Sequence, residues 1–283
     1  MAAVQDFIGY TPTWCPGCGN WSIGRAIMNS FAEQKLDPAQ VNILFDIGCS
    51  GNMNDFLNGS SMHTLHGRTI ANAVGCSIAN TSMPVVVVGG DGALYGEGGN
   101  HFLHACRGNH NITVIVHDNG VYGLTKGQVS PAGHQGYKSK TTPSGIIETP
   151  VYSLLLALTQ GASFVAQGFA SNLPQLSALI TAGMAHKGFS LINVLQPCVT
   201  FNKVNTYGYY FQKTYKLEAD HNPADFASAL AKAQEPMHER FPLGIIYKTD
   251  KPSYTDCIEQ LSDKVLVKQP QYTDSAQLLG HFK

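Results

Sequence analysis

The sequence predicts an α/β protein with a doubly wound, mostly parallel sheet and a C-terminal extension. Apolar runs of strand length alternate with amphipathic segments of helix length along most of the chain, as expected of a parallel sheet covered by helices. Two runs, 84–90 and 112–117, carry unbroken series of β-branched residues, at 85–88 and 112–116, which is typical of strands buried on both faces. Ligands of such sheets bind at the carboxyl ends of the strands.

The expected elements follow one another regularly. Strands are predicted at 41–47, 84–90, 112–117, 163–166, 190–195 and 243–248. Helices are predicted at 23–33, 68–80, 99–107, 150–160, 173–186 and 223–234. The segment 120–149 is long and rich in Gly, Ser, Thr, Pro and Lys, so we expect a functional loop there. We expect a domain at 1–198, followed at 199–283 by an extension that packs on that domain and on a partner subunit.

Composition narrows the class of protein. The net charge of −1 over 283 residues argues against binding to nucleic acid or to a membrane surface. Only 13% of the residues are charged, against about 25% in an average protein. This favours a chain whose surface is largely covered by partners, although a compact monomer with an uncharged polar surface would also fit. The chain shows neither an apolar run of membrane-spanning length nor a secretory signal, and we expect a cytoplasmic protein.

Four of the seven cysteines stand out by position. Cys15 and Cys18 form a Cys-Pro-Gly-Cys pair, Cys49 follows the first predicted strand, and Cys198 follows the fifth strand and a proline. Together they offer the four thiolates that a [4Fe–4S] cluster needs. A thioredoxin-type site is disfavoured because no convincing strand precedes Cys15, and a structural zinc site would normally bring a second close ligand pair. The other cysteines are interpreted as small buried hydrophobic residues: Cys76, Cys106 and Cys257.

A second motif closes two neighbouring strands. Gly90-Asp91-Gly92 ends one buried strand, and Asn119 follows the next. The tripeptide alone is more often a plain turn, but its spacing to Asn119 favours a site for Mg²⁺ and a diphosphate, with the backbone carbonyl of Val121 as a third protein ligand. The pattern resembles the cofactor motif of thiamine-diphosphate enzymes, which ends in paired Asn. Asp118 stands here at the first Asn position.

Taken together, these segments resemble the β subunit of 2-oxoacid:ferredoxin oxidoreductases. The resemblance spans residue 10 to about 250, and Tyr122-Gly123-Leu124-Thr125-Lys126-Gly127-Gln128 is its most specific run. The matching segments are 14–20, 47–51, 66–68, 88–92, 98–104, 118–131 and 196–202.

The resemblance implies a sheet of the thiamine-diphosphate-binding type and assigns ligands by position. Cys15, Cys18, Cys49 and Cys198 would hold a [4Fe–4S] cluster. Asp91, Asn119 and Val121 would hold Mg²⁺. The residues expected around the cofactor are Ile47, Gly48, Cys49, Ser50, His66, Gly67, Gly90, Asp91, Gly92, Ala93, Asn119, Val121, Tyr122, Gly123, Leu124 and Thr125.

Five residues are candidates for catalysis or substrate binding. We expect His66 to hydrogen-bond the diphosphate or relay protons, and Arg68 to help position an anionic substrate. The alternative is that both simply cap a helix. Thr125 and Lys126 are expected to border the substrate, with Lys126 as a second carboxylate-binding candidate. Asn52 stands where several members of the family carry a basic residue.

The resemblance also implies an activity. Such enzymes convert a 2-oxoacid and coenzyme A reversibly to CO₂ and an acyl-coenzyme A, and pass electrons singly to ferredoxin. We expect 2-oxoglutarate as the substrate, with pyruvate as the alternative, and a separate α subunit as a required partner. Two other classes stay open: a subunit of a non-oxidative thiamine enzyme, and a zinc-stabilised scaffold subunit without activity.

Overall fold

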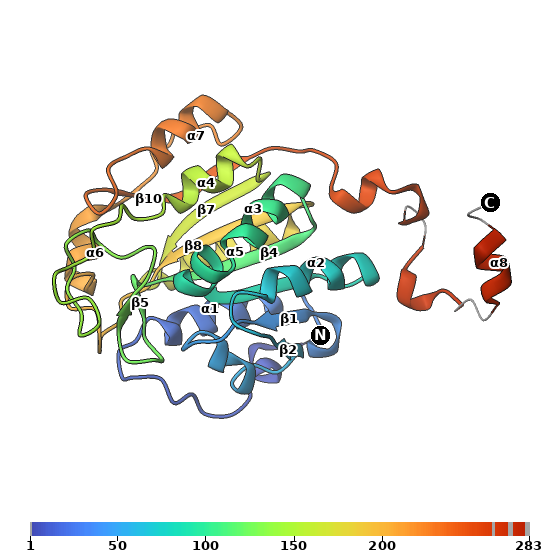
Figure 1. The fold of residues 1–283 in the computed structure, drawn as a ribbon, viewed down its shortest axis with the longest axis horizontal. Coiled ribbons are helices and arrows are strands. Elements are labelled where there is room, and N and C mark those ends of the chain that lie inside the picture. The colour runs from blue at the N-terminus through green and yellow to red at the C-terminus, as the bar shows by residue number, and fades with distance from the viewer. Residues whose placement is uncertain (1, 262–263, 271–273, 281–283) are drawn as a thin grey trace.

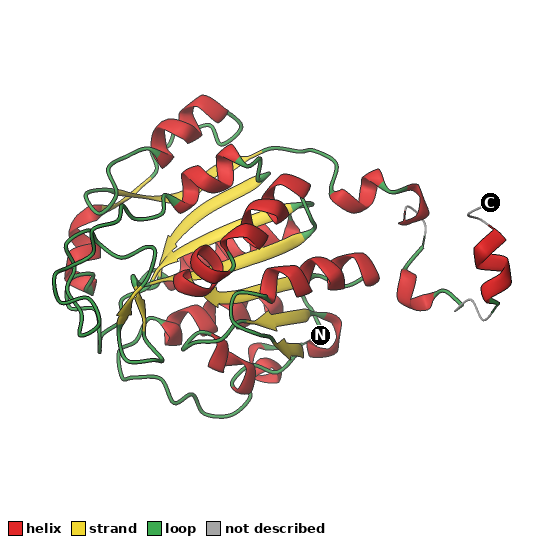
Figure 2. Cartoon of the chain, viewed as in Figure 1, coloured by secondary structure: helices red, strands yellow, loops and turns green. Residues whose placement is uncertain are grey.

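The computed structural model describes residues 2–261, 264–270 and 274–280. Its centre is an eight-stranded sheet in the order β2–β1–β3–β4–β8–β7–β10–β9 (Figures 1 and 2). The strands are β1 (Asn42–Phe45), β2 (Ser60–His63), β3 (Val85–Gly90), β4 (Ile112–Asp118), β7 (Phe164–Phe169), β8 (Phe189–Leu195), β9 (Thr214–Lys216) and β10 (Phe241–Lys248). The strands from β2 to β7 in this order are mutually parallel, whereas β10 is antiparallel to β7. The predicted doubly wound, mostly parallel sheet is confirmed.

Helices cover both faces of the sheet. One face packs against α1 (Asn20–Glu33) and α5 (Leu173–Ala185). The other face packs against α2 (Thr69–Ala79), α3 (Gly99–Gly108), α4 (Ser153–Thr159) and α7 (Phe226–Ala233). Successive valines of β3 alternate between the two hydrophobic cores, because neighbouring side chains of a strand point to opposite faces. All four, from Val85 to Val88, are nearly inaccessible to solvent, as the β-branched run predicted.

Every strand and helix expected from the sequence is present, and several short elements are added. A hairpin of β5 (Val121–Tyr122) and β6 (Gln128–Val129) opens the long loop. The segment directly after Asp91 forms a π-helical turn, Gly92–Glu97, ahead of α3. The other additions are the strands β2 and β9, the helices α6 (Tyr207–Lys213) and α8 (Ser275–Gly280), and the 3₁₀ turns Val4–Phe7, Pro38–Gln40, Gly51–Asp55, Tyr254–Cys257, Glu259–Leu261 and Leu266–Lys268.

The part of the chain after residue 199 adds the antiparallel edge of the sheet, through β9 and β10. Beyond β10 the chain turns back past Asn109, whose side-chain amide donates to the carbonyl of Pro252 (2.9 Å). The described residues that follow lie to one side of the sheet in Figure 1, at the red end of the colour bar. Within the described ranges, no helix combines the length and apolarity needed to cross a bilayer.

Candidate functional site

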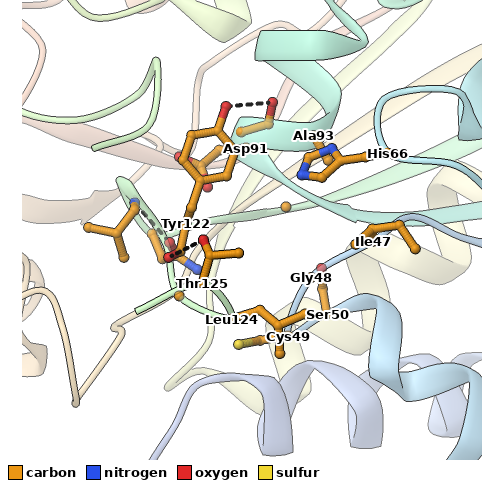
Figure 3. A pocket seen from close by; sticks show the side chains of 15 residues that line it. Ile47, Gly48, Cys49, Ser50, His66, Asp91, Ala93, Tyr122, Leu124 and Thr125 are labelled. Atoms are coloured by element: carbon orange, nitrogen blue, oxygen red, sulfur yellow. Dashed lines mark hydrogen bonds between the residues drawn. The ribbon is translucent and has the colours of Figure 1, made fainter. Parts of the chain in front are cut away.

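A pocket lies where β1, β3 and β4 end, at the carboxyl edge of the sheet (Figure 3). Three strand ends meet there because the strands are parallel neighbours. The loop after β1, the Gly-Asp-Gly turn after β3 and the β4–β5 connection form its wall. The lining residues are Ile47, Gly48, Cys49, Ser50, His66, Gly90, Asp91, Gly92, Ala93, Asn119, Val121, Tyr122, Gly123, Leu124 and Thr125. We call this the diphosphate pocket. Of the residues expected around the cofactor, Gly67 alone is not part of the lining.

Asp91 is a buried carboxylate fixed by the long loop. It is 1% exposed, and its Oδ2 accepts hydrogen bonds from the backbone N–H of Gly120 (3.2 Å) and from the Ser130 hydroxyl. Burial raises the pKa of Asp91 to about 6, although these hydrogen bonds favour the charged form. A buried carboxylate with no cation beside it fits a position where a metal ion binds.

Asn119 presents one oxygen to the same pocket. Its Oδ1 accepts from the backbone N–H of Val121 (3.0 Å), and its Nδ2 donates to Gln196 Oε1 (2.7 Å). An amide oxygen has two lone pairs, so one remains for a metal. The three residues expected to hold Mg²⁺ therefore line a single pocket, and their oxygen donors are of the type that Mg²⁺ prefers.

Gly92 and Tyr122 shape one wall of the pocket. A Cβ on Gly92 would lie 2.3 Å from the Tyr122 ring, so only glycine allows the ring to pack there. The Tyr122 hydroxyl lies 3.1 Å from the Glu97 carboxylate, to which it donates. His66 faces Tyr122, with 6.0 Å between ring centroids (Figure 3). Its Nδ1 lies 3.6 Å from the carboxylates of Asp46 and Glu97 and is buried, with no hydrogen-bond partner in the described part of the chain.

The other residues predicted for the site lie partly in the diphosphate pocket and partly outside it. The backbone N–H of Gly67 donates to Asp46 (3.0 Å), and the Arg68 guanidinium donates to the carbonyl of Glu97 (3.0 Å). Thr125 lines the diphosphate pocket, where its hydroxyl donates to Gln128 (2.6 Å). Asn52 and Lys126 line a second, neighbouring pocket.

The second pocket brings the four singled-out cysteines together. It has a volume of about 370 Å³, and we call it the cysteine pocket. Its lining residues are Thr13, Trp14, Cys15, Cys18, Cys49, Asn52, Asn119, Gly123, Leu124, Lys126, Gln196, Cys198, Val199, Thr200 and Phe201. A Cβ on Gly123 would lie 3.4 Å from the Cys49 sulfur and 3.7 Å from the Cys198 sulfur. Residues far apart in sequence thus enclose one cavity.

Two thiols of this pocket are held in the protonated form, and two receive hydrogen bonds. Burial, with a smaller contribution from the neighbouring thiols, raises the pKa of Cys18 and of Cys49 to about 11. The Thr200 hydroxyl donates to the Cys15 sulfur (3.0 Å), and the Gln196 amide donates to the Cys18 sulfur (3.2 Å). Ligation would release the thiol protons, as metal binding by cysteine requires.

The donor set fits a cluster better than a single ion. Among the described residues, no three His, Cys, Asp or Glu side chains converge closely enough to hold one metal ion. A four-iron cluster is wider than one ion, and cysteines placed around a cavity suit it. Of the other cysteines, Cys106 is buried as expected, whereas Cys76 is partly exposed and Cys257 exposed. The expectation of burial was wrong for Cys257, which lies in a 3₁₀ turn after the last strand of the sheet.

The two pockets share a wall formed by Cys49, Asn119, Gly123 and Leu124. Sequence reasoning did not single out two residues of the site: Ser130, whose hydroxyl donates to Asp91, and Gln196, which lines the cysteine pocket. Ser130 lies in an irregular loop where no pattern marks it. Gln196 directly precedes the Pro197-Cys198 pair, and that position was the available signal.

Comparison with known families agrees with this geometry. Residues 46–194 match the model of the thiamine pyrophosphate enzyme, C-terminal TPP binding domain. Residues 198–263 match the model of the C-terminal part of the pyruvate ferredoxin oxidoreductase beta subunit. The chain therefore contains the TPP-binding domain found in thiamine pyrophosphate enzymes. The segment that follows this domain resembles the C-terminal part of a ferredoxin-linked beta subunit.

Individual relatives narrow the class. The chain is 39% identical over 274 residues, 93% of its length and 88% of the relative's, to the 2-oxoacid:ferredoxin oxidoreductase subunit beta of Saccharolobus solfataricus. It is 33% identical over 263 residues, 89% of its length and 93% of the relative's, to the 2-oxoglutarate synthase subunit KorB of Methanocaldococcus jannaschii. A solved 2-oxoglutarate:ferredoxin oxidoreductase from Magnetococcus marinus superposes with a TM-score of 0.92 at 36% identity, covering 100% of this chain and 96% of that one. The chain belongs to the 2-oxoacid:ferredoxin oxidoreductase family, as a β subunit.

Proposed function

We propose that this β subunit binds thiamine diphosphate with Mg²⁺ in the diphosphate pocket and a [4Fe–4S] cluster in the cysteine pocket. The observation that carries the proposal is the wall shared by the two pockets, because it makes a two-electron donor and a one-electron acceptor close neighbours. Thiamine diphosphate supplies the electron sink for cleavage of a 2-oxoacid, and the cluster accepts electrons one at a time.

The residues around the pockets take the roles that their placement supports. Asp91, Asn119 and the carbonyl of Val121 hold Mg²⁺, and Cys15, Cys18, Cys49 and Cys198 hold the cluster. His66 hydrogen-bonds the diphosphate or moves a proton, since it lines the diphosphate pocket and its Nδ1 lies 3.6 Å from the carboxylates of Asp46 and Glu97.

Substrate binding is proposed for residues at the edges of both pockets. Thr125 borders the diphosphate pocket, and Lys126 and Asn52 border the cysteine pocket beside the shared wall. Lys126 is the cation nearest in sequence to that wall, which suits a substrate carboxylate. Arg68 would take part after leaving its two carbonyl partners, Gly67 and Glu97.

The reaction that we propose is the reversible, coenzyme A-dependent oxidative decarboxylation of 2-oxoglutarate to succinyl-coenzyme A, with ferredoxin as the electron acceptor and an α subunit as the partner. The names of the KorB relatives and of the solved Magnetococcus enzyme support 2-oxoglutarate. The second candidate is pyruvate, favoured by the name of the family model that matches residues 198–263. We place the protein in the cytoplasm, where thiols stay reduced. We also propose that residues 1–198 form the domain that binds both thiamine diphosphate and the cluster.

The test is reduction of viologen by the complex of this chain with its α subunit, given coenzyme A and one 2-oxoacid at a time. We expect the highest kcat/KM with 2-oxoglutarate, and a higher value with pyruvate would select the second candidate. Iron and zinc analysis of the same sample separates the remaining classes. An iron-free, active decarboxylase would be a non-oxidative enzyme, and one zinc without thiamine diphosphate would indicate a scaffold.

A further inference from the structure

Gln196 contacts both proposed metal centres through one side chain. Its Oε1 accepts a hydrogen bond from the side-chain amide of Asn119 (2.7 Å), and its Nε2 donates to the Cys18 sulfur (3.2 Å). Asn119 is a proposed Mg²⁺ ligand, and Cys18 is a proposed cluster ligand. A single buried amide, 1% exposed, therefore joins the two pockets.

The direction of this amide is fixed by the backbone. The N–H of Val121 points at Asn119, and only the carbonyl oxygen of Asn119 can accept it. The NH₂ group of Asn119 must then face Gln196, which accepts the hydrogen bond with its side-chain carbonyl oxygen. The remaining NH₂ group of Gln196 is left to face Cys18. The order of donors and acceptors runs without ambiguity from the Mg²⁺ site to the cluster site.

The surrounding structure holds Gln196 in this position. Its backbone N–H donates to the carbonyl of Asp118 (2.8 Å) and so continues the pairing of β8 with β4. A Cβ on Gly19 would lie 2.7 Å from the Gln196 Cγ, so the glycine after Cys18 leaves space for the glutamine side chain. Rotation of the side chain would bury unpaired polar atoms on two neighbours, which is costly.

We propose that Gln196 is a positioning residue that serves both centres: it orients Asn119 for Mg²⁺ and raises the reduction potential of the cluster through its hydrogen bond to Cys18. The inference rests on the proposed function, because it requires the cluster and the cofactor at these sites. Reduction adds negative charge to the cluster, and a donor aimed at a ligating sulfur stabilises the added charge. Hydrogen bonds to the sulfurs are among the factors that set the potentials of such clusters.

Two substitutions separate the two ends of the amide. Gln196→Leu removes the hydrogen bonds to Asn119 and Cys18, together with the longer one that Nε2 donates to the carbonyl of Pro197 (3.3 Å). Gln196→Glu keeps an oxygen for the Asn119 amide but replaces the donor that faces Cys18. The matched control is Thr200→Val, which removes the hydroxyl donor to Cys15 and has no bond to Asn119.

Each variant is purified as the complex with the α subunit. The cluster potential is measured by a redox titration followed by electron paramagnetic resonance, and the affinity for thiamine diphosphate with Mg²⁺ by calorimetry. We expect the ratio of reduced to oxidised cluster at a fixed potential to fall about tenfold in both Gln196 variants, a shift of ~59 mV for one electron. Thiamine diphosphate affinity should fall about fivefold in Gln196→Leu only. Thr200→Val should lower the potential and leave the affinity unchanged.

Equal loss of cofactor affinity in Gln196→Leu and Gln196→Glu would overturn the inference, as would an unchanged potential in either. Should Gln196→Leu not fold, Gln196→Glu and Thr200→Val still test the potential, and an unchanged potential in Gln196→Glu would again overturn it. Failure of the proposed function is visible separately, because a wild-type complex without a cluster or without thiamine diphosphate would show it before any variant is made.

Discussion

Asp91 is a carboxylate that is buried without a cationic partner in the described part of the chain, which is energetically unfavourable. Its carboxylate lies at the end of β3 with 1% exposure, and no cationic side chain accompanies it in any salt bridge within the described ranges. Hydrogen bonds from Gly120 and Ser130 hold it in place without neutralising it. A cation that enters the diphosphate pocket would remove the cost of burying this charge.

Asp91→Ala should therefore abolish the Mg²⁺-dependent binding of thiamine diphosphate, with a loss of at least about 100-fold, and leave the iron content unchanged. Excess Mg²⁺ should restore binding only in part, because coordination geometry is lost together with charge. Calorimetric titration measures the effect. The control is Asp118→Asn, which changes the half-buried carboxyl on the adjacent strand to the amide common in thiamine enzymes. An unchanged affinity in Asp91→Ala would reduce Gly90-Asp91-Gly92 to a plain turn.

The four cysteines of the cysteine pocket should differ from Cys257 in their effect on the cluster. Serine at Cys15, Cys18, Cys49 or Cys198 should lower iron content and electron transfer to ferredoxin, because a hydroxyl is a poor substitute for a thiolate ligand. Cys257→Ser changes an exposed thiol outside the cysteine pocket and should have no effect on either. Iron analysis and the visible spectrum decide the outcome. A normal cluster in Cys198→Ser would exclude Cys198 as the fourth ligand.

At the scale of elements, prediction succeeded where one pattern dominated. The runs 84–90 and 112–117 were recognisable because a strand buried on both faces must be apolar at every position. The grouping of the residues expected around the cofactor followed from these strands, since parallel strands bring their carboxyl ends together. The sequence therefore predicted that the candidate site residues lie together at the strand ends. Their roles in binding and catalysis remain predictions.

Elements without a strong pattern were missed. The strand β9 has three residues and the hairpin β5–β6 two on each side, too few for any periodicity. The π-helical turn Gly92–Glu97 is packed against Tyr122 at Gly92, a contact between distant segments. Gln196 was missed for the same reason, because its partners lie 77 and 178 residues away in sequence.

One contact between elements predicts a response to acid. His238, in the turn before β10, stacks on His134 of the long loop with 3.5 Å between ring centroids. Lys213 donates to the backbone carbonyl of His238, and Tyr209 hydrogen-bonds His134. Burial lowers the pKa of His238 to about 3, and the nearby His134 and Lys213 add to this shift. The unfolded chain, with a histidine pKa of about 6.5, takes up this proton first.

The contribution of His238 to the free energy of unfolding should thus fall as the pH drops below about 6.5, by about 1 kcal/mol at pH 5, a value reduced because the ring is partly exposed. Urea unfolding at pH 7 and pH 5 measures the difference. His238→Phe keeps the stacked ring without the titration and should lose less stability on acidification. Exposed His104→Phe serves as the control. Equal acid sensitivity of His238→Phe and the wild type would contradict this explanation.

At the scale of the whole molecule, exposed apolar side chains accompany the residues of the diphosphate pocket. Leu65, next to His66, is 77% exposed, and Leu124 of the shared wall is 47% exposed. Apolar residues beside a functional pocket mark a surface that a partner covers. The fold also has no second thiamine-binding domain among its described elements, although thiamine enzymes hold the two ends of the cofactor on two domains.

The purified chain alone should therefore show no oxidoreductase activity, even with cluster and cofactor restored. Adding the α subunit should produce activity that saturates at one α per β chain. Viologen reduction during such a titration is the measurement, and catalytically inactive α subunit is the control. Full activity of the isolated chain would contradict the requirement for a partner.

The shared wall of Cys49, Asn119, Gly123 and Leu124 limits how this protein can change over evolutionary time. If the cofactor and the cluster occupy the two pockets as proposed, a substitution there would alter the space for the substrate and the surroundings of the cluster in one step. Substrate preference and driving force are therefore not separately adjustable at these four positions. Ile47 and Thr125 line the diphosphate pocket without lining the cysteine pocket. Engineering toward a different 2-oxoacid should begin with those two residues, where selectivity can shift while the energetics of electron release stay intact.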